Sequence, residues 1–197
     1  MIYLPAPHIS DEVLSLLIVQ VFADCFTAHF NTQLLGGATE PLYRPACPGE
    51  PALLMFREDY PASALHEVAH WCIAGATRRQ QEDFGYHYIC APRSSKQQRE
   101  FFSAELRTQS LERFFADVLG LTFKPSADNF EADVDAFAKA IDAYSPQLDT
   151  WLCSAGGARA RVFAQALAAL RSALSASAPH DGAYESIPQP IVGLRTP

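Results

Sequence analysis

Apolar residues recur three or four positions apart in several long stretches of the chain, which is the spacing of a helix with one buried face. The first stretch follows Ser10, a favourable helix cap, and begins with two acidic residues that suit a helix start. The last is rich in alanine, arginine and leucine. The predicted helices cover residues 11–29, 95–119, 130–143, 145–153 and 158–175.

Strand patterns are short by comparison. Residues 53–56 are apolar and lie between turn-forming residues, which predicts a strand. Alternating aromatic and apolar residues over 85–91 predict a second strand. The stretch 30–51 is broken by glycines and prolines and is predicted to be a long irregular loop, in which Tyr43 suits a functional site or a packed surface equally well. The predicted fold class is therefore α+β, mostly helical with a small sheet.

Composition fits one globular domain of ordinary size. The chain has 197 residues, of which 49% are hydrophobic and 19% charged. We expect a single catalytic domain over residues 1–176 and a flexible tail over residues 177–197, where prolines are frequent and core residues few. The five cysteines are odd in number and show no Cys-x-x-Cys spacing, so we expect reduced thiols.

Charge and hydropathy narrow the class of partners and the location. The formal net charge of −7 argues against direct nucleic-acid binding, which requires basic residues facing the phosphates. The apolar run at residues 13–22 follows acidic rather than basic residues, so a secretory signal is not expected. No apolar run reaches the length of a membrane span, and we predict a cytoplasmic protein without membrane contact.

The most informative stretch is His66-Glu67-Val68-Ala69-His70, within a predicted helix between Pro61 and Gly75. Histidines four positions apart lie on one helix face, one turn apart, and can bind a single metal ion. In zinc peptidases a glutamate at the position of Glu67 acts as general base. Apolar neighbours would bury this helix partly. We therefore interpret it as a metal-binding helix, with Ser63 as a possible cap.

Two histidines leave a metal ion incompletely coordinated, and a third ligand must come from elsewhere. The compact peptidase pattern would place another histidine at position 76, where the chain has alanine. A carboxylate from the helix at 95–119 is the alternative. Glu105 is preferred because its neighbours are apolar and Gln109, one turn on, could orient it. Glu112 lies on the same face but is flanked by arginines that favour a solvated ion pair, and it stays the second candidate.

Four blocks of this sequence resemble the bacterial elongation factor P hydroxylase family. They occur in the family's order, and the resemblance extends over residues 14–170, roughly. Leu106 and Thr108 depart from the family's Glu-Val-Lys-Pro-Gln pattern, in which the glutamate and the glutamine match. The blocks are Ala-Leu-His-Glu-Val-Ala-His-Trp-Cys-Ile-Ala-Gly at 64–75, Asp-Phe-Gly-Tyr-His-Tyr at 83–88, Glu-Leu-Arg-Thr-Gln at 105–109 and Ser-Ala-Asp-Asn at 126–129.

This resemblance implies a hydroxylase with a non-haem iron centre, which His66, His70 and Glu105 would hold. The implied substrate is elongation factor P carrying a lysylated lysine, with dioxygen as co-substrate. Two histidines and one carboxylate leave open positions on Fe(II) for dioxygen. Zinc can bind the same three ligands and can be the metal present in the purified protein. Glu67 would then carry a proton or support a ligand. Tyr86 and Tyr88, on one face of the predicted strand, are further catalytic candidates.

Two other functions stay open at this point. A zinc peptidase could use the same histidines with a glutamate, and its fold would place a small sheet beside the histidine helix in a zincin-like arrangement. No predicted strand suggests a peptide-binding edge, however. A binding protein with a structural metal would need a fourth ligand, for which Cys72 and His87 are the candidates.

Overall fold

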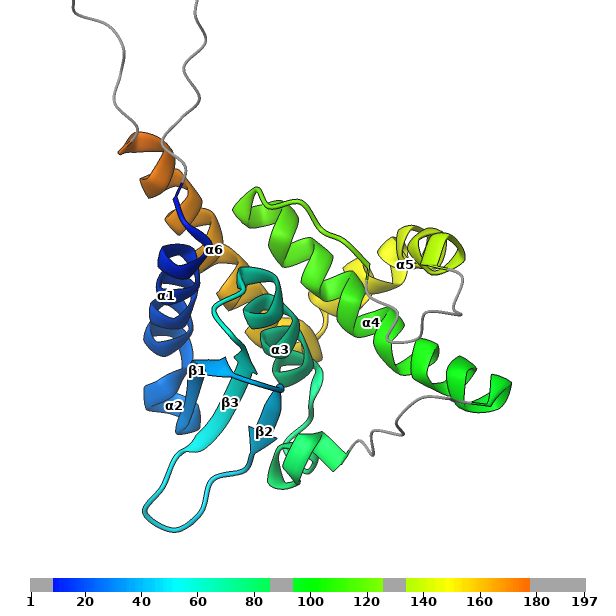
Figure 1. Ribbon diagram of the computed structural model, residues 1–197, viewed down its shortest axis with the longest axis horizontal. Coiled ribbons are helices and arrows are strands. Elements are labelled where there is room, and N and C mark those ends of the chain that lie inside the picture. Colours follow the sequence, from blue (N-terminus) through cyan, green and yellow to red (C-terminus); the bar gives the residue numbers. More distant parts are fainter. Residues whose placement is uncertain (1–8, 86–93, 126–133, 178–197) are drawn as a thin grey trace, which may run out of the picture.

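The computed structural model describes residues 9–85, 94–125 and 134–177, and most of these residues are helical (Figure 1). The prediction of a mostly helical chain with a small sheet is confirmed. The predicted tail, apart from Ser177, lies outside the described residues. The helices are α1 (Asp11–Phe22), α2 (Ala28–Phe30), α3 (Pro61–Ile73), α4 (Ser95–Leu119), α5 (Val134–Cys153) and α6 (Ala158–Ala176), and the strands are β1 (Thr32–Ala38), β2 (Leu42–Arg44) and β3 (Ala52–Arg57).

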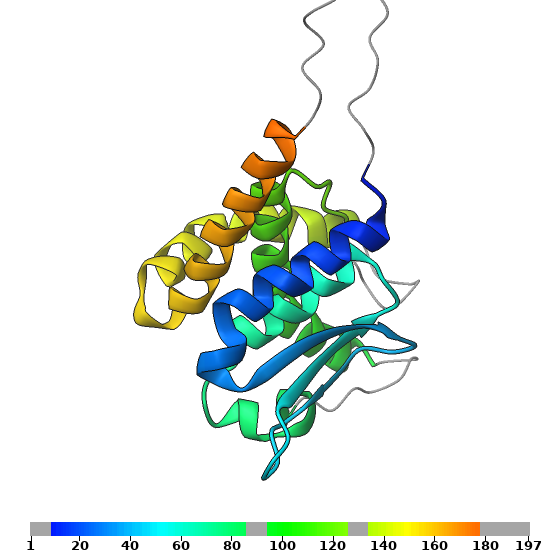
Figure 2. The ribbon, with the colours of Figure 1, turned by 90° about the vertical axis from the view of Figure 1, so that its left-hand side faces the viewer.

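The sheet has β3 at its centre, parallel to β1 and antiparallel to β2. Leu54 of β3 pairs with Leu34 on one side and with Tyr43 on the other. Alternate residues of β3 are buried, and α1 and α3 pack on the sheet beside each other (Figure 2). The strand predicted at 53–56 is therefore confirmed as the central strand.

The prediction of an irregular loop over residues 30–51 is wrong, because β1 and β2 both lie within it. Gly36 looks like a loop residue in the sequence but stands in β1. A Cβ atom there would lie 2.7 Å from Oδ1 of Asp59 and 2.8 Å from Cζ of Phe56. Only glycine permits this close approach, so a residue that suggests a turn in fact allows tight packing.

Helix α1 begins as predicted, with the backbone N–H of Val13 donating to Oγ of Ser10 over 3.3 Å. A π-helical turn, Ala23–Thr27, joins it to α2, so helical backbone continues to Phe30. By length and composition the helical span Asp11–Phe30 could cross a membrane, which corrects the expectation that no apolar run is long enough. Its buried face packs on α3, β1 and α6.

The second half of the chain forms three long helices. α4 packs against α3, α5 and α6. The two helices predicted at 130–143 and 145–153 are a single helix, α5, with Pro146 inside it. Residues 126–133 lie outside the described part. The prediction of α6 is confirmed to within one residue.

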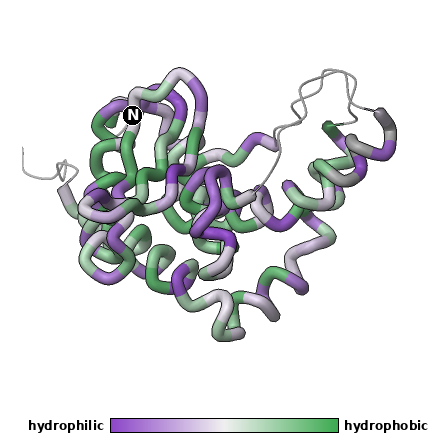
Figure 3. The backbone as a smooth tube through the Cα atoms, turned by 90° about the horizontal axis from the view of Figure 1, so that it is seen from below, coloured by the Kyte–Doolittle hydropathy of each residue, from purple (hydrophilic) through white to green (hydrophobic). Residues whose placement is uncertain are grey.

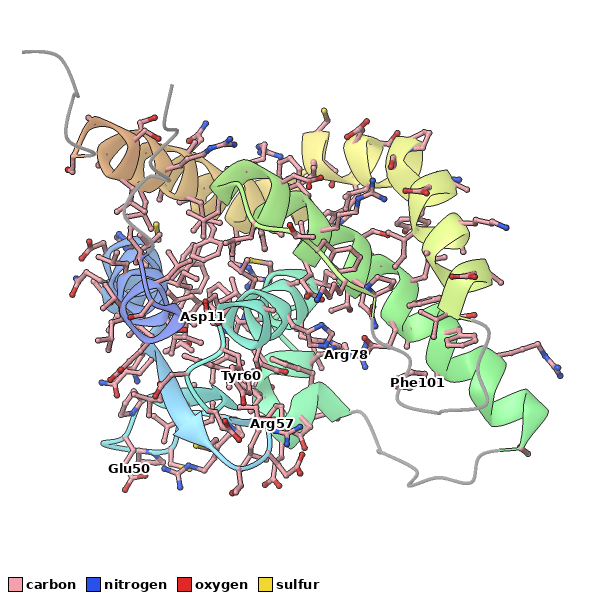
Figure 4. All side chains as sticks on the ribbon, turned by 45° about the horizontal axis from the view of Figure 1, so that its top comes forward. Asp11, Glu50, Arg57, Tyr60, Arg78 and Phe101 are labelled. Carbon is pink, nitrogen blue, oxygen red and sulfur yellow. The ribbon has the colours of Figure 1, made fainter. Side chains whose placement is uncertain are left out.

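The core lies where α1, α3 and α6 meet, and side chains crowd that space (Figure 4). Hydropathy alternates along the helices, as expected of helices with one buried face (Figure 3). Phe22 and Phe26 of the first helical span pack on Trp71 of α3, with ring centroids 5.1 and 4.8 Å from the Trp71 ring. Helix α3 is therefore fixed at the centre of the molecule. As predicted, the cysteines of the described part are free thiols.

Candidate metal centre

Helix α3 carries both histidines of the His-Glu-x-x-His stretch, and most of its residues are buried. Pro61 occupies the first turn as predicted. Ser63 does not cap the helix, because the helix starts two residues earlier, and its Oγ instead accepts the backbone N–H of Arg57 over 3.0 Å. The helix ends at Ile73, close to the predicted stop at Gly75.

His66 and His70 of α3 meet Glu105 of α4 at one point. One nitrogen or oxygen from each side chain lies within 4.8 Å of the others, which is close enough to hold one metal ion. Nε2 of His66 and Nε2 of His70 are 3.1 Å apart. The two oxygens of Glu105 lie 3.3 Å from Nε2 of His70 and 3.6 Å from Nε2 of His66. Two nitrogen donors and one carboxylate thus face a shared position.

A second set of contacts, made by side chains of α4, lies behind these three groups. Oε2 of Glu112 is 2.8 Å from Nδ1 of His66. Oγ1 of Thr108 is 3.4 Å from Nδ1 of His70. Nε2 of Gln109 donates to Oε2 of Glu105 over 3.3 Å, the contact that the sequence predicted. Such outer contacts fix the orientation of ligand side chains.

The expectation that Glu112 is a solvated ion-pair residue is wrong, because its side chain is buried against His66. The two arginines that flank it in the sequence point elsewhere. Arg107 stacks over the Trp151 ring at 4.3 Å, and Arg113 pairs with Asp142. Sequence neighbours on a helix face different directions, and this separates Glu112 from both arginines.

The histidines and carboxyl groups of this cluster shift one another's pKa values. Burial lowers the pKa of His66, but the carboxylates of Glu112, Glu105 and Glu67 outweigh burial and raise it to about 10. Burial raises the pKa of Glu105, yet its hydrogen bond to His70 and the charges of both histidines lower it to about 2. Glu105 is thus ionised at neutral pH, as a metal ligand must be.

Glu67 lies on the same helix turn as the histidines and is nearly fully buried. Burial raises the pKa of its carboxyl group, and the charges of His66 and His70 oppose that rise only in part. Within the described residues its carboxyl group makes no hydrogen bond. A raised pKa favours the protonated form of this buried carboxyl group, which suits a role in proton transfer.

One side of the cluster is flanked by the ring of Phe84, which the sequence did not assign to the site. Phe84 is buried and its ring lies 6.3 Å from the His70 ring, nearly parallel to it. Tyr43 stacks on Phe84, with ring centroids 4.2 Å apart. Tyr43 is thus a buried neighbour of the site. Among the described residues the predicted strand at 85–91 includes only Gly85, which ends a 3-10 turn, and Tyr86, His87 and Tyr88 lie outside them.

Comparisons with known proteins agree on one family. A family model described as elongation factor P hydroxylase matches residues 21–178. The elongation factor P lysine hydroxylase of Haemophilus influenzae is 41% identical to this chain over 117 residues, which cover 59% of this chain. The matched stretch spans 66% of that relative's own length, slightly less than two thirds. The family match includes all the residues of the cluster around His66 and His70.

Proposed function

Since this chain belongs to the elongation factor P hydroxylase family, we propose that it hydroxylates a lysine side chain of elongation factor P. The observation that carries the proposal is the convergence of His66, His70 and Glu105 on one position. A face of two histidines and one carboxylate leaves coordination positions open for dioxygen on Fe(II). Non-haem Fe(II) oxygenases use a centre of this kind.

We assign the ligand role to His66, His70 and Glu105, with Fe(II) as the working metal and zinc as a possible occupant after purification. The donor set fits, because two imidazole nitrogens and an ionised carboxylate within 4.8 Å of one another suit either ion. When bound, the ferrous ion would activate dioxygen, so that one oxygen atom would enter a C–H bond of the substrate and the other would leave as water, with two protons and with two electrons from a reductant.

The chain's own residues orient the ligands and handle protons. Glu112 at Nδ1 of His66 and Thr108 at Nδ1 of His70 would hold each ring with Nε2 directed at the shared position. Glu67, whose pKa burial raises, would carry a proton at its carboxylate. Tyr86 and Tyr88 stay predictions as catalytic residues.

The proposed substrate is the lysine of elongation factor P after it has received a lysyl group. The lysine is the group named for the Haemophilus relative, and the lysyl group follows from the family resemblance. The proposal includes a cytoplasmic location, where translation factors act, and no nucleic-acid or membrane partner. It also includes a single catalytic domain over residues 1–176.

A zinc peptidase with the same three ligands is the alternative function. The sheet beside α3 supports a zincin-like arrangement, which we propose as a description of the fold around the site. Family membership favours the hydroxylase, because the matching family and the Haemophilus relative are both named for hydroxylation.

Intact mass spectrometry of lysylated elongation factor P tests the function. The Fe(II)-loaded chain, with ascorbate in air, should add one oxygen atom, about 16 Da. Glu105→Ala should lose this gain. Glu50→Ala, which changes an exposed glutamate remote from α3 and α4, should keep it.

The outcomes separate the alternatives. A gain that survives in Glu105→Ala and disappears in Glu112→Ala would transfer the ligand role to Glu112. No gain from a chain that has bound metal would overturn the hydroxylase proposal. Cleavage of peptides by the zinc-loaded chain would then support the peptidase.

A further inference from the structure

The backbone that follows α3 passes through a left-handed segment close to the metal centre. Asp83, Phe84 and Gly85 have φ angles of +46°, +56° and +72°. Glycine adopts such angles readily, but a bulky aromatic residue seldom does. Strain of this kind persists only where surrounding contacts impose it, and it is common at functional sites. The contacts of Phe84 therefore indicate what the strain achieves.

Hydrogen bonds from two elements impose this conformation. The backbone N–H of Tyr43, in β2, donates to Oδ1 of Asp83 over 2.8 Å. The hydroxyl of Tyr43 donates to the carbonyl oxygen of Arg79 over 2.8 Å. Nε of Arg78, labelled in Figure 4, donates to the carbonyl oxygen of Phe84 over 2.9 Å. The sheet and the turn after α3 thus hold the segment at both ends.

The result of these contacts is the placement of one ring. Phe84 is only 4% exposed and stacks on Tyr43, with planes 14° apart and centroids at 4.2 Å. Its plane lies 17° from that of His70, with centroids 6.3 Å apart. Tyr43, Phe84 and His70 form a series of nearly parallel rings that begins in the sheet and ends at the metal centre.

We propose that Tyr43, Asp83 and Phe84 are positioning residues that hold the His70 imidazole in its metal-binding orientation. The inference rests on the ligand role of His70 in the proposed function. Phe84 limits movement of the ring on one face. Thr108 contacts Nδ1 and Glu105 contacts Nε2, which limits rotation of the ring in its own plane. The strained segment places an apolar wall where the contacts from α4 do not reach.

The test compares Phe84→Leu with Phe163→Leu in the full chain. Leucine keeps apolar volume at both buried sites but removes the ring. Phe163 lies in the core, where its ring packs against the rings of Phe22 and Phe115. Two measurements apply to each variant: the dissociation constant for Co(II), from its visible absorption, and the ¹⁵N chemical shifts of the His70 ring in the metal-free protein. The ¹⁵N shifts report which ring nitrogen carries the proton.

Phe84→Leu should weaken Co(II) binding about tenfold, as loss of a group that orients a ligand does. It should also move the His70 ¹⁵N shifts towards the average of two tautomers. Phe163→Leu should lower thermal stability and leave both readouts as in the wild type. Wild-type Co(II) affinity and unchanged ¹⁵N shifts in Phe84→Leu would overturn the inference, as would equal changes in both variants.

Asp83 offers a second comparison. Asp83→Asn keeps an oxygen acceptor for the backbone N–H of Tyr43 and tolerates positive φ. It should therefore keep the wild-type readouts. Asp83→Ala loses both properties and should behave like Phe84→Leu. If Phe84→Leu changes the Co(II) affinity and the His70 ¹⁵N shifts but the wild type hydroxylates nothing, only the proposed function is overturned. The two results are separable because neither readout requires turnover.

Discussion

At the scale of single residues, the candidate centre depends on what lies behind each histidine ring. Glu112 and Thr108 contact the outer nitrogens of His66 and His70. They lie 46 and 38 positions further along the chain. Helical spacing reveals the histidine pair from sequence alone, but it does not show which side chains of another helix contact the outer ring nitrogens. This is why Glu112 looks like a surface residue until α4 is placed against α3.

Glu112→Gln should weaken metal binding about tenfold while the fold is kept, because an outer carboxylate that orients a ligand contributes this much. Glutamine preserves the shape and a hydrogen-bonding oxygen but removes the charge. Absorption titration with Co(II) measures the effect. Asp142→Asn removes an exposed carboxylate paired with Arg113 and serves as the control. Equal affinities in the two variants would contradict the role assigned to Glu112.

Metal binding should release a proton, since the raised pKa of His66, about 10, leaves its ring protonated at neutral pH in the metal-free chain. A metal ion takes the neutral imidazole. The apparent affinity should therefore rise with pH, by about tenfold per unit, while His66 is protonated and Glu105 ionised. Calorimetry at pH 7, in buffers of different ionisation enthalpy, counts the protons. A count of zero would show that His66 is already neutral.

At the scale of elements, the long helices are predictable because each buries one face. The helical span Asp11–Phe30 and α6 match their predicted bounds to within one residue. The strands β1 and β2 are not predictable in this way. Their order comes from pairing with β3, and Gly36 marks a close approach to Phe56 rather than a turn. Pro146 likewise suggests a helix start, yet α5 continues through it.

The packing of α4 against the core should matter more for stability than any contact at the metal centre. Leu111, beside Glu112, is fully buried in the core. Leu111→Ala should lower the free energy of unfolding by about 2–5 kcal/mol, because it removes buried apolar volume and leaves a cavity. Urea unfolding measures this. Leu16→Ala, at a 62% exposed position of α1, should change it by less than about 0.5 kcal/mol. Similar losses in both would contradict this description of the core.

At the scale of the whole molecule, the site exists because β2, α3 and α4 each bring a side chain to it. Sequence alone predicts Glu105 over Glu112 and pairs it with Gln109, since both follow from helical spacing and apolar neighbours. It does not predict the aromatic wall of Phe84, because a positive φ runs against the preference of a bulky aromatic residue. Tertiary contacts with Tyr43 decide that conformation.

The most direct test of the central claim is the origin of the oxygen atom in the product. The Fe(II)-loaded chain is incubated with lysylated elongation factor P and ascorbate under ¹⁸O₂ in ordinary water. We predict a mass gain of about 18 Da on the lysine, lost in Glu105→Ala, because one atom of dioxygen enters the substrate. A gain of about 16 Da under ¹⁸O₂, or none from metal-loaded chain, would contradict a dioxygen-using centre at His66, His70 and Glu105.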